Sequence, residues 1–249
     1  MKDSAFGLLA SGDLYIDFYD SDGNLTGFLD PDEVGNCKKF ALKVETEKKE
    51  NKLNGRDTLG QNGDVYTRLT NSTISLSLNR YTSRMLAAAM MGTSSDQTAA
   101  LAAYTATITA IHDRWVEIGE ELLSTCVVKD ATDTTTYTVD TDYEVNTRLG
   151  MIRVLSTGSI ADSATLHISG NTLAKTGSKI LGSNQTVVNA KLKLDGKDNV
   201  SGDNVQVTVY KAQLSSDTEF DLMAEDFPEL TFTGTMVTPS GLTSPFEII

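Results

Sequence analysis

A stretch near the N-terminus has the residue spacing of a calcium-binding loop. The four candidate ligands occupy positions 1, 3, 5 and 12 of an EF-hand loop: Asp22, Asn24, Thr26 and Glu33. Carboxylate and amide oxygens at this spacing can surround Ca²⁺. The context is unfavourable, because a strand pattern precedes the stretch, Pro31 falls near its end, and threonine is a poor ligand at position 5. The stretch is a weak metal candidate, and a solvated turn is the simpler interpretation.

The remaining reactive residues form no recognisable catalytic or cofactor motif. His112, His167, Cys37 and Cys126 lack the spacing of zinc ligands. Both histidines lie in strand patterns, where a structural role is more common than a catalytic one. The phrase KTGSK at residues 175–179 lacks the spacing and the following helix of a phosphate-binding loop. We therefore expect no catalytic residue, no cofactor and no enzymatic activity.

The excess of acidic residues argues against a protein that binds nucleic acid. The 249 residues include 21 Lys and Arg against 34 Asp and Glu, which gives a net charge of −13 at pH 7. Nucleic-acid binders neutralise phosphates with clustered cations. The longest apolar run, residues 85–91, is far shorter than the roughly 20 residues that cross a bilayer, and the N-terminus lacks a signal-peptide core. We expect a soluble protein without a membrane partner, made in a reducing compartment.

Hydrophobic and polar residues alternate along much of the chain, which is the pattern of half-buried strands. Three early segments show it: residues 14–18, 37–46 and 72–79. Residues 98–124 are ambiguous, because AALAA favours a helix, but the β-branched residues and a turn at 112–114 favour a hairpin. From residue 126 onward short strand patterns follow one another without a helix, which excludes parallel βαβ folds. The sequence predicts a mainly β sandwich or barrel.

Residues 81–91 change to helical spacing. Thr82 or Ser83 can cap a helix there, and Gly92 can end it. The apolar residues of the segment recur on one helical face: Met85, Leu86, Ala89 and Met90. We expect this stripe to cover the open face of a sheet, and a methionine-lined binding groove is the alternative.

Residues 47–69 form the longest stretch without a clear period. The segment reads EKKENKLNGRDTLGQNGDVYTRL and is rich in charge, asparagine and glycine. A loop of more than about 15 residues is unusual inside a compact domain and is usually functional or disordered. The residues alone fit either a functional surface or a flexible loop insertion without a function.

The order of several phrases resembles the major tail tube proteins of long-tailed, siphovirus-like bacteriophages. The resemblance covers nearly the whole chain. The phrases are GDLYIDFYDSDGNLTGFLD (12–30), GNCKKFALKVETEKKE (35–50), STISLSLNRYTSRMLAAAMMG (72–92), TYTVDTDYEVNTRLGMIRVL (136–155) and LDGKDNVSGDNVQVTVYKAQL (194–214).

This resemblance implies a single tail-tube domain over residues 1–249, with a β-sandwich or barrel core and one flanking α-helix. A β-rich, immunoglobulin-like elaboration is expected around residues 125–175. Six copies would form a ring by joining sheets edge to edge, and rings would stack into a hollow tube. Residues 47–69 would be the arm that contacts the neighbouring ring. Its expected self-assembly residues are Lys48, Lys49, Lys52, Arg56, Asp57, Leu59, Asp64, Tyr66 and Arg68.

The resemblance also implies a location in the virion tail, reached from the host cytoplasm. The expected partners are further copies of the chain, a tape measure protein, a tail terminator and tail-tip or baseplate proteins, with DNA ejected through the lumen without specific binding. Two physical arguments agree. A ring satisfies unpaired strand edges, and an acidic wall repels DNA across a Debye length of about 8 Å. The alternative is a surface β-sandwich that binds a glycan or protein, with or without calcium at residues 22–33.

Overall fold

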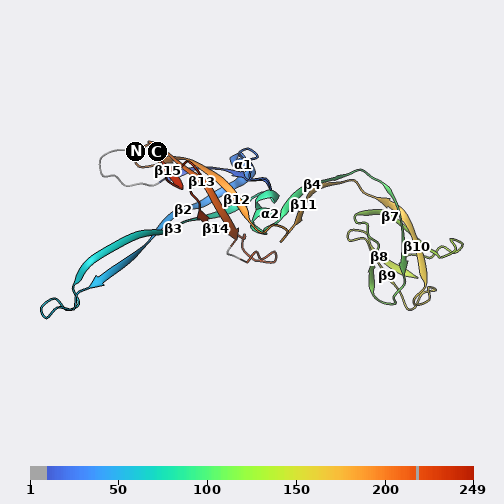
Figure 1. Cartoon of the computed structure of the whole chain (residues 1–249). Helices are drawn as coiled ribbons and strands as arrows, with labels where there is room; N and C mark the ends of the chain where they lie inside the picture. The colour runs from blue at the N-terminus through green and yellow to red at the C-terminus, as the bar shows by residue number, and fades with distance from the viewer. Residues whose placement is uncertain (1–9, 217–218) are drawn as a thin grey trace. The chain divides into compact units, whose positions relative to one another are not determined.

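The computed structural model describes residues 10–216 and 219–249 and divides into two compact units. The first unit comprises the chain up to residue 94 and from residue 180 onward, and the second unit comprises residues 95–179. Strands dominate both units, which confirms the prediction of a mainly β fold (Figure 1). The sequence suggested a single domain with an elaboration around residues 125–175. The structure instead gives each unit its own hydrophobic core, and the second unit starts earlier.

A seven-stranded antiparallel sheet forms the first unit. Its strands lie in the order β1-β12-β13-β14-β3-β2, and the short β15 pairs with β13 beside β14. The strands are β1 (Ala10–Phe18), β2 (Gly35–Lys52), β3 (Asn62–Tyr81), β12 (Val188–Asp198), β13 (Asn204–Ser216), β14 (Leu230–Met236) and β15 (Phe246–Ile248). Two short helices accompany the sheet, α1 (Pro31–Val34) and α2 (Ser83–Ala89).

One face of this sheet buries the first core. Ile16 on β1, Leu76 on β3 and Phe232 on β14 are fully buried, as the alternating patterns of β1 and β3 predict. Met85 on α2 joins the same core, so the apolar stripe of the predicted helix does cover the sheet. Each such side chain contributes about 1.5–3 kcal/mol by leaving water. Neither α1 nor α2, the helices of the described chain, combines the length and apolar content of a bilayer crossing.

Two three-stranded sheets, β5-β10-β7 and β6-β9-β8, form the second unit around its own core. Its strands are β5 (Ala103–Thr109), β6 (Trp115–Glu117), β7 (Leu123–Asp130), β8 (Tyr143–Asn146), β9 (Met151–Val154) and β10 (Thr165–Thr172). The boundary between the units falls within two strands that pair with each other, β4 (Thr93–Ala99) and β11 (Lys175–Leu181).

The predicted hairpin within residues 98–124 is wrong in its pairing. Strands are present there, but β5 pairs with β10 and β6 pairs with β9, so the two belong to different sheets. The turn between them is real, with Asp113 at a positive φ of 59°. It turns the chain from one sheet to the other instead of closing a hairpin.

Candidate assembly surfaces

Residues 47–69 form a β-hairpin where the sequence predicted a loop. β2 and β3 remain paired from Gly35 opposite Tyr81 to Lys52 opposite Asn62. Residues 53–61 make the turn, which is closed by a hydrogen bond of 2.8 Å from the Leu53 N–H to the Gln61 carbonyl. Figure 1 shows this pair of strands extending beyond the rest of the first unit's sheet. We call residues 47–69 the arm hairpin.

Both faces of the arm hairpin are exposed. Every side chain from 48 to 52 and from 61 to 70 faces solvent, so no hydrophobic alternation marks these strands in the sequence. Five large apolar side chains are among the exposed ones: Leu53, Leu59, Val65, Tyr66 and Leu69, with Leu59 75% and Leu69 74% exposed. A two-stranded hairpin alone is marginally stable in water. These exposed apolar side chains make the arm hairpin a candidate interaction surface.

The predicted self-assembly residues spread over the whole arm hairpin. Lys48, Lys49 and Lys52 lie on β2, Asp64, Tyr66 and Arg68 lie on β3, and Arg56, Asp57 and Leu59 lie in the turn. The hairpin therefore joins residues that the sequence separates by up to twenty positions, and it presents them on one protruding element.

Some charges of the arm hairpin neutralise one another and others do not. Arg68 forms an ion pair with Glu47 at 2.6 Å, and Lys52 pairs with Glu50 at 3.0 Å. The Lys52 hydrogen bond and charge hold the pKa of Glu50 below its ordinary value. Among the described residues, five charged side chains of the arm hairpin form no ion pair: the cations Lys48, Lys49 and Arg56 and the carboxylates Asp57 and Asp64. Lys48 still contributes to lowering the pKa of Glu50 through its charge.

The outer edge of β2 is a second candidate assembly surface. β2 is the terminal strand of the sheet and forms a ladder with β3 alone among the described strands. At the other edge of the sheet, β1 is partly covered, because Leu29 forms an isolated bridge with Ile16 of β1 and Leu25 forms one with Tyr19, the residue after the strand. An uncovered strand of 18 residues offers a row of backbone donors and acceptors to another chain.

The structure gives the EF-hand-like residues other partners. Asp20, which the spacing did not select, organises the turn by accepting the backbone N–H groups of Asp22 at 2.9 Å and Asn24 at 2.8 Å. The hydrogen bond from the Asn24 N–H is the largest of the causes that hold the pKa of Asp20 below its ordinary value. Glu33 accepts the Asp30 N–H at 3.1 Å and so completes the capping box of α1.

Calcium should not bind this turn tightly. Thr26 donates its backbone N–H to the buried Asp17 at 2.9 Å, and within the described chain no three His, Cys, Asp or Glu residues gather as a metal site. We expect calorimetric titration with calcium to give no micromolar binding. Saturable micromolar heat that Glu33→Gln abolished would contradict this expectation and revive the calcium-dependent alternative.

The two histidines make structural contacts. A ring nitrogen of His112 lies 2.8 Å from the Ile160 carbonyl oxygen, and His167 on β10 contacts the Asp133 carboxylate at 3.1 Å on the surface of the second unit. The sequence predicted a strand at His112, but the structure places this residue outside the strands, where it forms an isolated bridge with Val154. Burial raises the pKa of both cysteine thiols, which disfavours the reactive thiolate.

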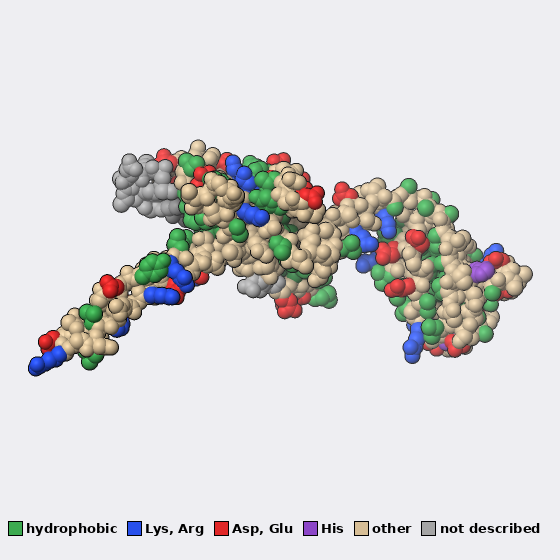
Figure 2. Space-filling model, viewed as in Figure 1, with side chains coloured by type: hydrophobic (Ala, Val, Ile, Leu, Met, Phe, Trp, Pro, Cys, Tyr) green, Lys and Arg blue, Asp and Glu red, His purple; other side chains and the backbone are tan. Residues whose placement is uncertain are grey.

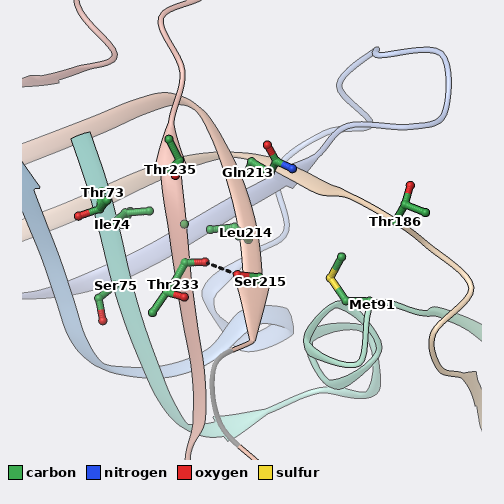
Figure 3. A pocket seen from close by; sticks show the side chains of 11 residues that line it. Thr73, Ile74, Ser75, Met91, Thr186, Gln213, Leu214, Ser215, Thr233 and Thr235 are labelled. Atoms are coloured by element: carbon green, nitrogen blue, oxygen red, sulfur yellow. Dashed lines mark hydrogen bonds between the residues drawn. The ribbon is translucent and has the colours of Figure 1, made fainter. Parts of the chain in front are cut away.

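A hollow of about 620 Å³ lies against β3, β13 and β14 (Figure 3). Its lining is mainly threonine and serine, together with Ile74 and Leu214 of the core. Cross-strand register places Thr73 opposite Thr235 and Thr235 opposite Gln213. The Ser215 hydroxyl donates to the Thr233 carbonyl at 3.4 Å. Among the residues that the structure describes, no charged side chain lines this hollow. Hydroxyl and amide groups alone supply binding contacts but no general acid or base.

A comparison with protein families gives a match over most of the chain. The model of the family described as "Protein of unknown function UCP028589" matches residues 8–241. The matched range includes the arm hairpin and the whole second unit. No curated protein matches the chain.

Proposed function

The chain belongs to the family of proteins of unknown function UCP028589, and we propose that it is a structural subunit of a phage tail. In this proposal identical copies form hexameric rings, and the rings stack into a hollow tube in the virion. DNA leaves the virion through the lumen of the tube. The subunit acts as a wall and catalyses no reaction.

The arm hairpin is the observation that carries this proposal. Its two strands continue the sheet of the first unit but bury no side chain of their own between residues 48 and 52 or 61 and 70. Such a hairpin gains stability only when a second surface covers its apolar side chains. A protruding, sheet-continuous hairpin suits a subunit that reaches from one ring to the next.

The open edge of β2 supports assembly into rings. A copy that adds a strand along this edge satisfies backbone groups that one chain leaves to water. Head-to-tail pairing of two different edges closes into a ring when the rotation per copy divides a full turn. The net charge of −13 favours a wall that does not hold DNA by counterion release.

Purified protein should form rings or tubes in a concentration-dependent manner. Negative-stain electron microscopy and sedimentation velocity across a hundredfold range of protein concentration measure this directly. Rings at low concentration and tubes at high concentration are the expected result, because stacking adds a second, weaker contact. Monodisperse monomers at every concentration, with or without a tail-tip seed, would overturn the proposal.

A further inference from the structure

The connection between β13 and β14 carries exposed apolar side chains among acidic ones. Leu222 is 82% exposed, Met223 90% and Phe227 94%, the three most exposed large hydrophobic side chains of the described chain. Residues 219–229 contain five carboxylates and no cation: Glu219, Asp221, Glu225, Asp226 and Glu229. We call residues 219–229 the acidic loop. Figure 2 shows acidic and hydrophobic side chains beside each other in this region of the first unit.

Both ends of the acidic loop are fixed to the first unit. The Phe220 ring meets the Tyr81 ring edge-on, with 5.9 Å between centroids. Glu229 pairs with Lys38 at 2.5 Å and accepts the Ser77 hydroxyl at 2.8 Å. Lys38, and after it Ser77, lowers the pKa of Glu229. The middle of the loop is therefore held outward, away from the core.

The acidic loop and the arm hairpin lie at opposite ends of one pair of strands. β14 starts at Leu230, opposite Leu78 near the C-terminal end of β3, and its Thr235 lies opposite Thr73. The arm hairpin leaves the sheet beyond the other end of this ladder, toward Asn62 at the start of β3. Because the ends face apart, the arm hairpin of a chain does not reach its own acidic loop.

The two surfaces are complementary in charge and in apolar character. The arm hairpin carries five cations against four carboxylates, whereas the acidic loop carries five carboxylates and no cation. Among the described residues, Lys48 and Lys49 of the arm hairpin and Glu225 and Asp226 of the acidic loop have no ion-pair partner. Each surface also exposes large apolar side chains that gain free energy when covered. Opposite charges steer two such surfaces together and disfavour pairing of like ends.

We propose that the arm hairpin of one copy binds the acidic loop of a copy in the next ring. The inference rests on the proposed function and deepens it by naming the surface that receives the arm. Two different surfaces at opposite ends of the first unit's strands make a heterologous contact, which can propagate without closing and so gives open-ended stacking. The contact joins apolar burial with pairing of the free lysines and carboxylates.

Charge reversal on each surface, alone and together, tests this contact. The loop variant Glu225→Lys with Asp226→Lys should still form rings but raise the concentration needed for tubes at least tenfold. The arm variant Lys48→Glu with Lys49→Glu should behave in the same way. A chain that carries all four substitutions should stack within about threefold of the original protein, because attraction is restored with the signs exchanged.

A matched control changes net charge by the same amount elsewhere. Glu120→Lys with Glu121→Lys alters two exposed carboxylates of the second unit and should leave stacking unchanged. Rings and tubes are counted by electron microscopy, and circular dichroism checks that each variant is folded. If the loop variant stacks normally, or if the fourfold variant is not rescued, the contact is wrong although the ring proposal stands. Absence of both rings and tubes in the unaltered protein overturns the proposed function and this inference together.

Discussion

A chain in which Asn-Gly replaces residues 48–67 should form rings but no tubes. Cross-strand register pairs Glu47 with Arg68, so a two-residue turn closes the shortened hairpin at an existing pair. Asn-Gly is the preferred sequence for such a turn. The removed side chains are exposed or at the turn, and changes at such positions alter stability by only about 0.5 kcal/mol. The melting temperature should stay within roughly 2 °C of the original.

Thermal melting and electron microscopy together decide this prediction. A control chain with Asn-Gly in place of residues 131–134 shortens an exposed turn of the second unit, where the Asp130 N–H bonds to the Thr135 carbonyl. That chain should still make tubes. Normal tubes from the armless chain would show that the arm hairpin does not join rings. A large loss of melting temperature would show instead that the arm hairpin supports the fold of its own subunit.

Sequence alone located strands where one face is buried. Ile16 and Leu76 each belong to a series of apolar residues at every second position of their strand, and both lie in the first core. The arm hairpin escaped this reasoning, because its strands have no buried face and therefore no hydrophobic period. Lys49 lies opposite Tyr66 because of the register between β2 and β3. Amino-acid composition does not predict this register.

The division into two units was not predictable for a related reason. β5 pairs with β10, so Thr109 lies opposite Thr165, and no local pattern specifies a partner that far along the chain. The boundary lies within the paired strands β4 and β11, so no glycine- or proline-rich linker marks it in the sequence. The acidic character of residues 219–229 is plain in the sequence, but the exposure of their apolar side chains is not, because apolar residues resemble core residues until burial is known.

Phe232→Ala should destabilise the first unit strongly, and Phe227→Ala should not. Phe232 is fully buried on β14, whereas Phe227, five positions earlier, is 94% exposed in the acidic loop. Truncation of a buried phenylalanine costs about 3–5 kcal/mol, because it loses transfer free energy and leaves a cavity. For a unit of this size the melting temperature should fall by roughly 6–20 °C. Truncation of Phe227 should change it by no more than about 2 °C.

The separate cores predict that Phe232→Ala acts on one thermal transition. In differential scanning calorimetry, Phe232→Ala should lower the melting temperature of the first unit and leave that of the second unit unchanged. A second variant, Leu166→Ala, identifies the transition of the second unit, because it should lower that transition alone. An equal shift of the whole profile would mean that the units unfold as one.

The same pair of phenylalanines separates the effect of a substitution on folding from its effect on assembly. Phe227→Ala keeps the first core intact but removes the most exposed apolar side chain of the acidic loop, so it should weaken stacking without weakening the fold.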